Sequence, residues 1–348
     1  MRYILLPILA ALFISSAAQE LPAAKSAVTI AFYNVENLFD TNDDSSAGDD
    51  EYLPLSAKAW DKKRYEKKVK DIAGTLGSLN KIELPGIIGL AEVENRLVLE
   101  DMVKESPLRR GRYEIVHSDS PDERGIDVAL LYRPDEFTLI ESRTISVNFS
   151  FAPLDMTRDI LYVRGMLDDG RSYHVYVNHW PSRAGEARES EMKRISAAAA
   201  LRKDIDNILN FESDARIIIM GDFNDEPTNM SLLQVLNATN KRKNYTHRDL
   251  FNLMYDGHNS GNTGTISYRD NWQMFDQIIV SFSLFTNDGG YYTGFGDGMV
   301  HNSEEIMFTN PETGSVSPNR TFGGNTYYGG VSDHLPVYLI LKKDEPAK

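Results

Sequence analysis

The chain has 348 residues, a formal net charge of −14 and a hydrophobic content of 41%. It is long enough for one large domain or two small ones, and it can fill a substantial core. Its acidity argues against a broad basic surface for nucleic acid, because nonspecific affinity comes mostly from lysine and arginine contacts to phosphates. The absence of cysteine excludes disulfide bonds and a lipid-modified N-terminal cysteine.

The N-terminal residues are typical of an export signal. Arg2 provides a positive start, residues 3–14 form an apolar run and residues 15–18 are small enough for cleavage. The apolar run is shorter than the roughly 20 residues that span a bilayer, which favours cleavage near residues 18–20 over an uncleaved anchor. We therefore expect residues 1–19 to be a signal peptide and the mature protein to be periplasmic or secreted, without membrane insertion.

An acidic loop, a helix and a strand follow. Loop 40–51 is crowded with aspartate and glutamate, and we interpret it as a solvated turn in preference to a second cation site. Apolar side chains at helical spacing predict an amphipathic helix over residues 60–79, and its basic faces favour a solvated surface over a phosphate-facing patch. Residues 86–93 predict an apolar strand. The apolar helix positions are Tyr65, Val69, Ile72, Leu76 and Leu79.

Most of the remaining chain predicts strands, with one more long helix over residues 187–211. Short connections between consecutive strands imply antiparallel pairing, and the mixture predicts two sheets packed face to face with helices outside, an α/β fold. Segment 255–330 is rich in loop residues, so it is expected to be functional or mobile, and its aromatic residues either stack on a substrate or anchor the loops. The predicted strands are 126–132, 137–147, 160–167, 173–178, 215–220 and 275–281.

Five short polar motifs each follow an apolar run. A strand end is a rigid position that faces a cleft, which suits catalytic groups. Carboxylates, amides and histidines without cysteine indicate a hard cation and a phosphate substrate. The motifs are Tyr33-Asn34-Val35-Glu36-Asn37, Ala91-Glu92-Val93-Glu94-Asn95, Asn178-His179-Trp180, Gly221-Asp222-Phe223-Asn224 and Ser332-Asp333-His334.

These motifs, in this order, resemble the endonuclease/exonuclease/phosphatase superfamily, and the resemblance extends from about Val28 to Leu341. It implies a four-layer α/β/β/α sandwich in which two mixed, mainly antiparallel sheets pack face to face. It also implies a single catalytic domain over residues 28–343 and hydrolysis of phosphate esters with Mg²⁺ or Mn²⁺.

The first, second and fourth motifs contribute candidate metal and phosphate groups. Glu92 is the best candidate metal ligand, because Mg²⁺ prefers carboxylate oxygen and a strand end positions it well. Asn34 resembles the amide that orients the metal ligand or the phosphate. Asp222 and Asn224 are two residues apart, so they face the same side of an extended segment. The resemblance implies that Asp222 orients or deprotonates water and that Asn224 binds a phosphoryl oxygen.

The histidines complete the predicted site. His334 resembles the histidine that contacts the scissile phosphate, and Asp276 resembles the aspartate that holds its ring. His179 resembles a second histidine that binds phosphate or protonates the leaving group. Asp333 resembles a further metal ligand or orienting residue, and the sequence leaves both roles open. Arg183 follows the Asn-His-Trp motif, where a bidentate phosphate contact is possible.

The preferred function is an exported, Mg²⁺- or Mn²⁺-dependent phosphodiesterase, most simply a nuclease acting on DNA or RNA. The alternative is a phosphatase or phospholipase-like phosphodiesterase on a small or lipid phosphate, which the acidic charge favours. An inactive binding module ranks last, because every predicted catalytic position holds a competent residue. No arginine follows Asn224 and no Cys-Asp-Arg motif is present, which lowers the preference for a phosphoinositide substrate. A monomer is favoured.

Overall fold

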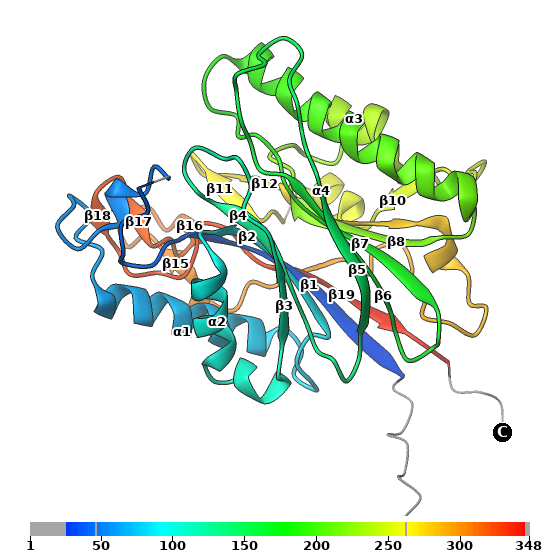
Figure 1. The fold of residues 1–348 in the computed structure, drawn as a ribbon, viewed down its shortest axis with the longest axis horizontal. Coiled ribbons are helices and arrows are strands. Elements are labelled where there is room, and N and C mark those ends of the chain that lie inside the picture. The colour runs from blue at the N-terminus through cyan, green and yellow to red at the C-terminus, as the bar shows by residue number, and fades with distance from the viewer. Residues whose placement is uncertain (1–25, 46, 262, 345–348) are drawn as a thin grey trace, which may run out of the picture.

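Two large sheets form the centre of the computed structural model, which describes residues 26–45, 47–261 and 263–344 (Figure 1). The predicted signal peptide lies outside these described residues. The first sheet has the order β14-β19-β1-β2-β4-β3: Met299–Val300, Val337–Lys342, Ala27–Leu38, Ile87–Val93, Asp127–Tyr132 and Glu114–His117. The second has the order β5-β6-β7-β8-β13-β10-β9: Thr138–Ile145, Ile160–Met166, Ser172–His179, Arg216–Asp222, Asp276–Ser281, Leu250–Asn252 and Ala238–Thr239.

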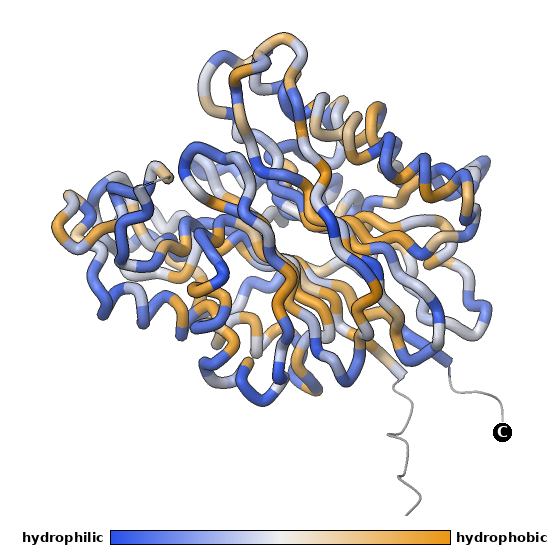
Figure 2. Tube along the Cα trace, in the orientation of Figure 1, coloured by the Kyte–Doolittle hydropathy of each residue, from blue (hydrophilic) through white to orange (hydrophobic). Residues whose placement is uncertain are grey.

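The two sheets pack face to face through side chains that alternate along each strand. In β1, Ile30 and Phe32 point into the core between the sheets, where they join Ile218 and Met220 of β8. The intervening residues of both strands point away, so each strand is apolar on both faces and reads as a continuous hydrophobic run. Figure 2 shows this apolar centre.

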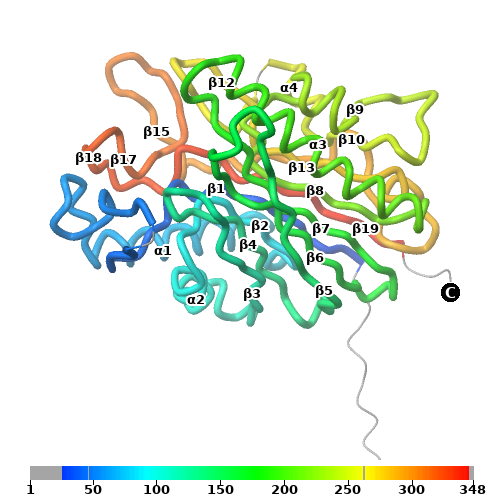
Figure 3. The backbone as a smooth tube through the Cα atoms, turned by 45° about the horizontal axis from the view of Figure 1, so that its top comes forward, coloured from blue at the N-terminus to red at the C-terminus, as the bar shows by residue number. Residues whose placement is uncertain are grey.

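Helices cover the outer faces of the sheets (Figure 3). Helices α1 (Lys62–Ser78) and α2 (Arg96–Lys104) pack on the first sheet, and α3 (Ala187–Phe211) packs on the second. Buried side chains such as Ile72 of α1 and Leu201 of α3 each contribute about 1.5–3 kcal/mol of hydrophobic stabilisation. The predicted four-layer sandwich is confirmed, and no helix among the described residues is long and apolar enough to cross a membrane.

The predicted elements match the structure closely, with differences at the ends and in segment 255–330. Helix α1 begins at Lys62, because the Asp61 side chain accepts a hydrogen bond from the Arg64 amide and caps the helix. One of its lysines is not solvated: Lys68 is buried, and its ammonium donates to the Val331 carbonyl. The late segment contains α4 (Tyr255–Ser260) and three hairpins. The hairpins are β11–β12 (Ile266–Tyr268, Asn271–Gln273), β15–β16 (Met307–Thr309, Val316–Pro318) and β17–β18 (Phe322–Gly323, Thr326–Tyr327).

The acidic loop that follows β1 also departs from the expected solvated turn. Asp40 and Asp49 are buried, and Glu94 at the end of β2 accepts a hydrogen bond from the Asp40 amide at 2.6 Å. Burial raises the pKa of Glu94 to about 8, and the nearby aspartates Asp40, Asp49 and Asp44 add to the shift. The folded protein therefore favours a protonated Glu94 at neutral pH.

We expect Glu94→Gln to stabilise the protein more as the pH rises. The pKa of Glu94 is about 8 in the folded protein, compared with an ordinary value of 4.5. Its contribution to the free energy of unfolding is therefore complete below pH 4.5 and is lost as the pH rises through 8. Glutamine cannot ionise, so its advantage should grow across this window to on the order of 1–2 kcal/mol, or a few degrees in melting temperature, after allowance for partial solvation. Thermal denaturation of both proteins across this pH range measures it. Glu66→Gln, on the exposed face of α1, is the control, and an equal pH response of the two variants would contradict the prediction.

Candidate active site

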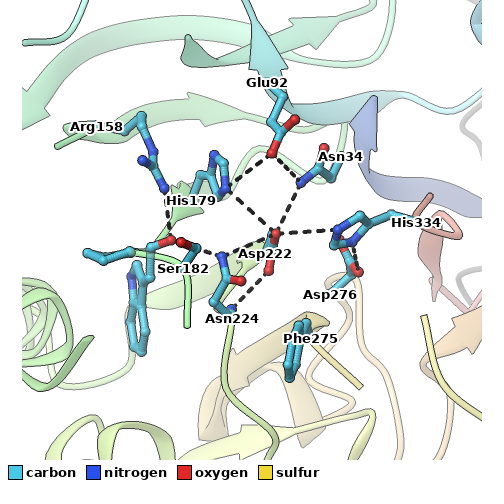
Figure 4. A network of polar contacts seen from close by, with 12 residues as sticks. Asn34, Glu92, Arg158, His179, Ser182, Asp222, Asn224, Phe275, Asp276 and His334 are labelled. Carbon is cyan, nitrogen blue, oxygen red and sulfur yellow. Dashed lines mark hydrogen bonds and ion pairs between the residues drawn. The ribbon is translucent and has the colours of Figure 1, made fainter. Parts of the chain in front are cut away.

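Asp222, the last residue of β8, lies at the centre of a polar network (Figure 4). Its Oδ2 accepts a hydrogen bond from Asn34 Nδ2 at 3.0 Å, and its Oδ1 accepts one from the Asn224 amide at 2.9 Å. The side chain of Asn224 also donates to the Trp180 carbonyl at 3.0 Å. Asp222 is 1% exposed, so these donors stabilise a carboxylate that water scarcely reaches.

Strand register explains why residues from distant motifs meet at Asp222. Strand β8 pairs in parallel with β7 and antiparallel with β13, so Asp222 lies between His179 on one side and Asp276 on the other. Gly221 permits this packing, because a Cβ there would lie 2.5 Å from the Asn178 carbonyl oxygen. The Gly-Asp-x-Asn motif thus combines a close backbone approach with a strand-end carboxylate.

His334 and Asp276 form the predicted pair. His334 Nδ1 lies 2.7 Å from Asp276 Oδ2, and both side chains are buried. His334 Nε2 is 3.8 Å from Asp222 Oδ2, so the ring stands between the two carboxylates. The Thr265 hydroxyl accepts hydrogen bonds from the Phe275 and Asp276 amides, each at 3.1 Å, and fixes the start of β13.

Burial and neighbouring charges set the protonation states of these groups. Burial raises the pKa of Asp222 to about 7, although the charge of His334 opposes the rise. Burial disfavours a charged His334, but the carboxylates of Asp276 and Asp222 outweigh it and raise the pKa of that imidazole well above its usual value. Burial, reinforced by Arg158, lowers the pKa of His179. The site therefore combines an imidazolium at His334, a neutral imidazole at His179 and a carboxyl at Asp222 that titrates near neutrality.

Glu92 lies at the more open edge of the network. It has a φ of +62°, a left-handed conformation that costs about 1–3 kcal/mol for residues other than glycine. The Asn37 amide donates to its Oε2 at 2.9 Å, and its Oε1 is 3.4 Å from Asn34 Nδ2 and 3.7 Å from His179 Nε2. The strained backbone therefore holds this carboxylate beside Asn34 and His179.

The donor set fits a hard divalent cation. Ligand atoms of Asp222, Asp276 and His334 lie within 4.8 Å of one another, and Glu92 faces the same network. Asp276 Oδ1 is buried and has no hydrogen-bond partner among the described residues. A bound cation would supply the interaction that this carboxylate oxygen lacks. Several buried carboxylates around one imidazolium leave an excess of negative charge, which a bound cation would neutralise.

Two predicted site residues are engaged elsewhere. Arg183 donates to the Asn224 carbonyl at 2.8 Å and to Asn229 Oδ1 at 3.0 Å, and its guanidinium stacks on the Phe275 ring. It thus holds the loop after Asp222, and its predicted phosphate contact stays a prediction. Asp333 accepts from Arg320 Nη2 at 3.0 Å and is not among the three residues whose ligand atoms cluster, so its role as a metal ligand also stays a prediction.

Three further residues support the site. Arg158 is buried beside it and donates to the Trp180 carbonyl at 2.9 Å and to Asp122 Oδ2 at 2.8 Å. The Ser332 hydroxyl donates to the Asn34 carbonyl at 2.7 Å and so ties the last motif to the first. The Thr265 hydroxyl holds Asp276, as described above. Only Ser332 had a signal in the sequence, because it belongs to the Ser-Asp-His motif; an isolated arginine or threonine carries none.

A two-sheet sandwich that joins an aspartate-held histidine to strand-end carboxylates and amides is suited to the hydrolysis of phosphoric esters. The chain belongs to the Endonuclease/Exonuclease/phosphatase family, whose model matches residues 29–343. The family depends on divalent metals, which agrees with the buried acidic and histidine groups of this site. The family resemblance of the five motifs is thereby confirmed.

Solved structures share this fold at low sequence identity. Zebrafish (D. rerio) TDP2, complexed with a single-strand DNA product, is 14% identical with a TM-score of 0.55, over 92% of this chain and 100% of that one. Human nocturnin, whose catalytic domain was solved with a sulfate anion, is 16% identical with a TM-score of 0.53, over 91% and 95%. A mannosyl-6-phosphatase of Bacteroides thetaiotaomicron is 17% identical with a TM-score of 0.53, over 90% and 99%. No curated protein matches the sequence.

Proposed function

We propose that this protein is an exported, Mg²⁺- or Mn²⁺-dependent phosphodiesterase that acts on nucleic acid. The charge balance of the site supports a diester substrate. A phosphate monoester carries about 1.5 to 2 negative charges near neutral pH, whereas a diester carries only one. The network contains three carboxylates, of Glu92, Asp222 and Asp276, and one positive group, the His334 imidazolium. The charge of Arg158 is already balanced by Asp122. One divalent cation would leave little positive charge for a dianion.

The residues of the site have distinct roles in this proposal. Asp276 holds His334 Nδ1, so His334 Nε2 lies on the side of Asp222. In this proposal, the N–H group at Nε2 donates a hydrogen bond to a phosphoryl oxygen of the substrate. Asp222, whose pKa is raised to about 7, accepts the proton of the attacking water while the Asn34 and Asn224 donors fix its orientation. His179 is neutral, so it contributes a hydrogen bond to the phosphate or the leaving oxygen without carrying a charge.

The proposed metal would be held mainly by Glu92, with Asp222 and Asp276 as the nearby carboxylates. When bound, it supplies Lewis-acid stabilisation of the negative charge that develops on the phosphoryl oxygens.

The second candidate is a phosphatase or phospholipase-like phosphodiesterase on a small or lipid phosphate. The net charge of −14 favours it, because an acidic protein attracts long nucleic acid poorly. The structural similarity to a mannosyl-6-phosphatase agrees with a small substrate. An inactive binding module is disfavoured by the complete set of catalytic groups around Asp222.

Parallel assays separate a diesterase from a phosphatase by the choice of diesters or monoesters, and they separate a nuclease from a lipid phosphodiesterase by the cleavage of DNA or RNA. We expect the mature protein with Mg²⁺ to hydrolyse plasmid DNA, RNA or bis-p-nitrophenyl phosphate faster than p-nitrophenyl phosphate or inositol phosphates. Added salt should slow cleavage of long DNA, because it screens the few basic contacts. A preference for monoesters would instead support the second candidate.

Export is tested on protein recovered from the producing cell. We expect intact-mass analysis to give a chain that starts near residues 18–20, because the apolar run of the leader is followed by small residues. A chain that retains Met1 in the membrane fraction would refute cleavage of the leader.

A further inference from the structure

A large cavity opens beside the active site, and the catalytic roles above leave it unused. Its volume is about 710 Å³, within the range of about 300–1,000 Å³ that is usual for ligand pockets. The β11–β12 hairpin, the β15–β16 hairpin and segment 317–333 line it. Asp333 belongs to its wall and directly precedes the catalytic His334. The cavity therefore adjoins the segment that carries His334.

Backbone contacts fix the cavity wall to the catalytic pair. The Leu335 amide donates to the Thr265 carbonyl at 2.7 Å, and Ile266 of β11 forms a β-bridge with His334. The Thr265 hydroxyl holds the Asp276 amide, so one residue joins the hairpin to both members of the pair. The position of the wall relative to the scissile phosphate is thus set by the same strands that set the site.

Aromatic rings and amides line this cavity. Tyr328 is 61% exposed and Phe308 is 46% exposed, whereas other aromatic residues of the late segment, such as Tyr291 and Phe322, are buried anchors. Tyr328 packs on Gly323, where a Cβ would lie 2.6 Å from its ring, so one side of the ring is supported. Asn310 and Asn319 also line the wall, and Asn310 Oδ1 already accepts from the Glu312 and Thr313 amides. This combination suits a planar heterocycle, which stacks on a ring and hydrogen-bonds at its edge.

The tip of the β11–β12 hairpin presents charged side chains to the cavity at a conformational cost. Arg269 and Asp270 have φ values of +52° and +61°, although glycine or asparagine is preferred in such a two-residue turn. Both residues line the cavity, and the Arg269 guanidinium lies 5.1 Å from the centroid of the Tyr268 ring. Arg320 and Asp333, paired with each other, also line it. The wall charges balance, so the cavity is not a basic track for a long polyanion.

We propose that this cavity is a subsite for the nucleoside attached to the scissile phosphate, with its base stacked on Tyr328 and Arg269 directed at a flanking phosphate. The inference rests on the proposed function and deepens it. The proposed substrates are short single strands, strand ends or nucleotide esters. Each of these places one base in the cavity and needs no extended basic surface.

Two chromogenic diesters separate the subsite from the chemistry. Thymidine 5′-(4-nitrophenyl phosphate) and methyl 4-nitrophenyl phosphate release the same leaving group, and only the first carries a nucleoside. We expect Tyr328→Ala to lower kcat/KM for the thymidine ester about tenfold, in line with the loss of one base–aromatic stack. The methyl ester should change less than about twofold. Tyr328→Phe should retain both rates, because it keeps the ring.

Phe211→Ala is the control, because Phe211 is a 95% exposed aromatic residue at the end of α3 and does not line the cavity. It should leave both esters unchanged. Equal effects of Tyr328→Ala on the two esters, or none on either, would overturn the subsite.

If the wild-type protein turns over neither diester, the proposed function fails, and calorimetric binding of thymidine 5′-monophosphate then decides the subsite separately. Weaker binding by Tyr328→Ala than by Phe211→Ala supports it, and equal binding by the two variants overturns it. Tighter wild-type binding of mannose 6-phosphate than of thymidine 5′-monophosphate also overturns it, in favour of a sugar phosphate.

Discussion

Chelation of divalent cations with EDTA is expected to abolish turnover, and Mg²⁺ or Mn²⁺ should restore it. Without a cation, the carboxylates of Glu92, Asp222 and Asp276 face a negatively charged substrate across one imidazolium. Loss of the Lewis acid removes several kcal/mol of transition-state stabilisation, or on the order of a thousandfold in rate. Hydrolysis of bis-p-nitrophenyl phosphate in EDTA, and after titration with each metal, measures the effect. Full turnover in EDTA, or activity with Zn²⁺ alone, would contradict the proposed site.

The same titration distinguishes the predicted metal ligands. We expect Glu92→Gln to raise the Mg²⁺ concentration for half-maximal activity by at least about tenfold, because the neutral amide is a weaker ligand for a hard cation. Asp333→Asn is the matched change, and it should have a smaller effect because Asp333 is paired with Arg320 at 3.0 Å. Equal shifts in the two variants would show that Asp333 is a ligand as well. An unchanged Mg²⁺ requirement in Glu92→Gln would remove Glu92 from the metal site.

Asp276→Asn is expected to lower turnover by about ten- to a thousandfold while the protein stays folded. Asparagine keeps the volume and can still accept from His334 Nδ1, but it removes the charge that stabilises the imidazolium. The pKa of His334 should therefore fall, and the alkaline limb of the pH–rate profile should move to lower pH. Melting temperature should change little.

A double-mutant cycle tests the Asp276–His334 pair directly. Residues that act as a unit are non-additive, so His334→Ala should cost much less in the Asp276→Asn background than in the wild-type protein. Turnover of the four proteins on the same diester gives the coupling. If the two losses simply multiply, Asp276 and His334 do not act as the proposed pair, despite their separation of 2.7 Å.

Local patterns in the sequence were sufficient to predict most of the strands and helices that form the layers of the fold. Alternating or continuous apolar runs predicted the long strands, and the helical spacing of apolar residues predicted α1 and α3 with nearly correct ends. Helix α2 and the late hairpins were not predicted. Such short elements contain too few periodic apolar positions to be distinguished from loops. The two-sheet arrangement was predicted from the mixture of strands and helices with short connections, and the family resemblance implied the four layers.

The sequence also identified, by motif, most of the polar groups that meet at Asp222. Four of the motifs lie at the end of a strand, whereas Ser332-Asp333-His334 lies in the loop before β19. The family resemblance already implied the pairing of Asp276 with His334, whereas the other partners were decided by the tertiary structure. His334 and Asp276 are 58 residues apart, and Asn34 and Asp222 are 188 apart, so strand pairing and sheet packing bring them together. Non-local packing also places Arg183 against the loop of Asn224 and buries Lys68 and Asp49. The cavity around Tyr328 is likewise formed by two hairpins and a loop that are distant in the chain. Local pattern specifies which face of a strand is buried, whereas hydrogen-bond partners and cavities depend on register and on segments that are distant in the chain.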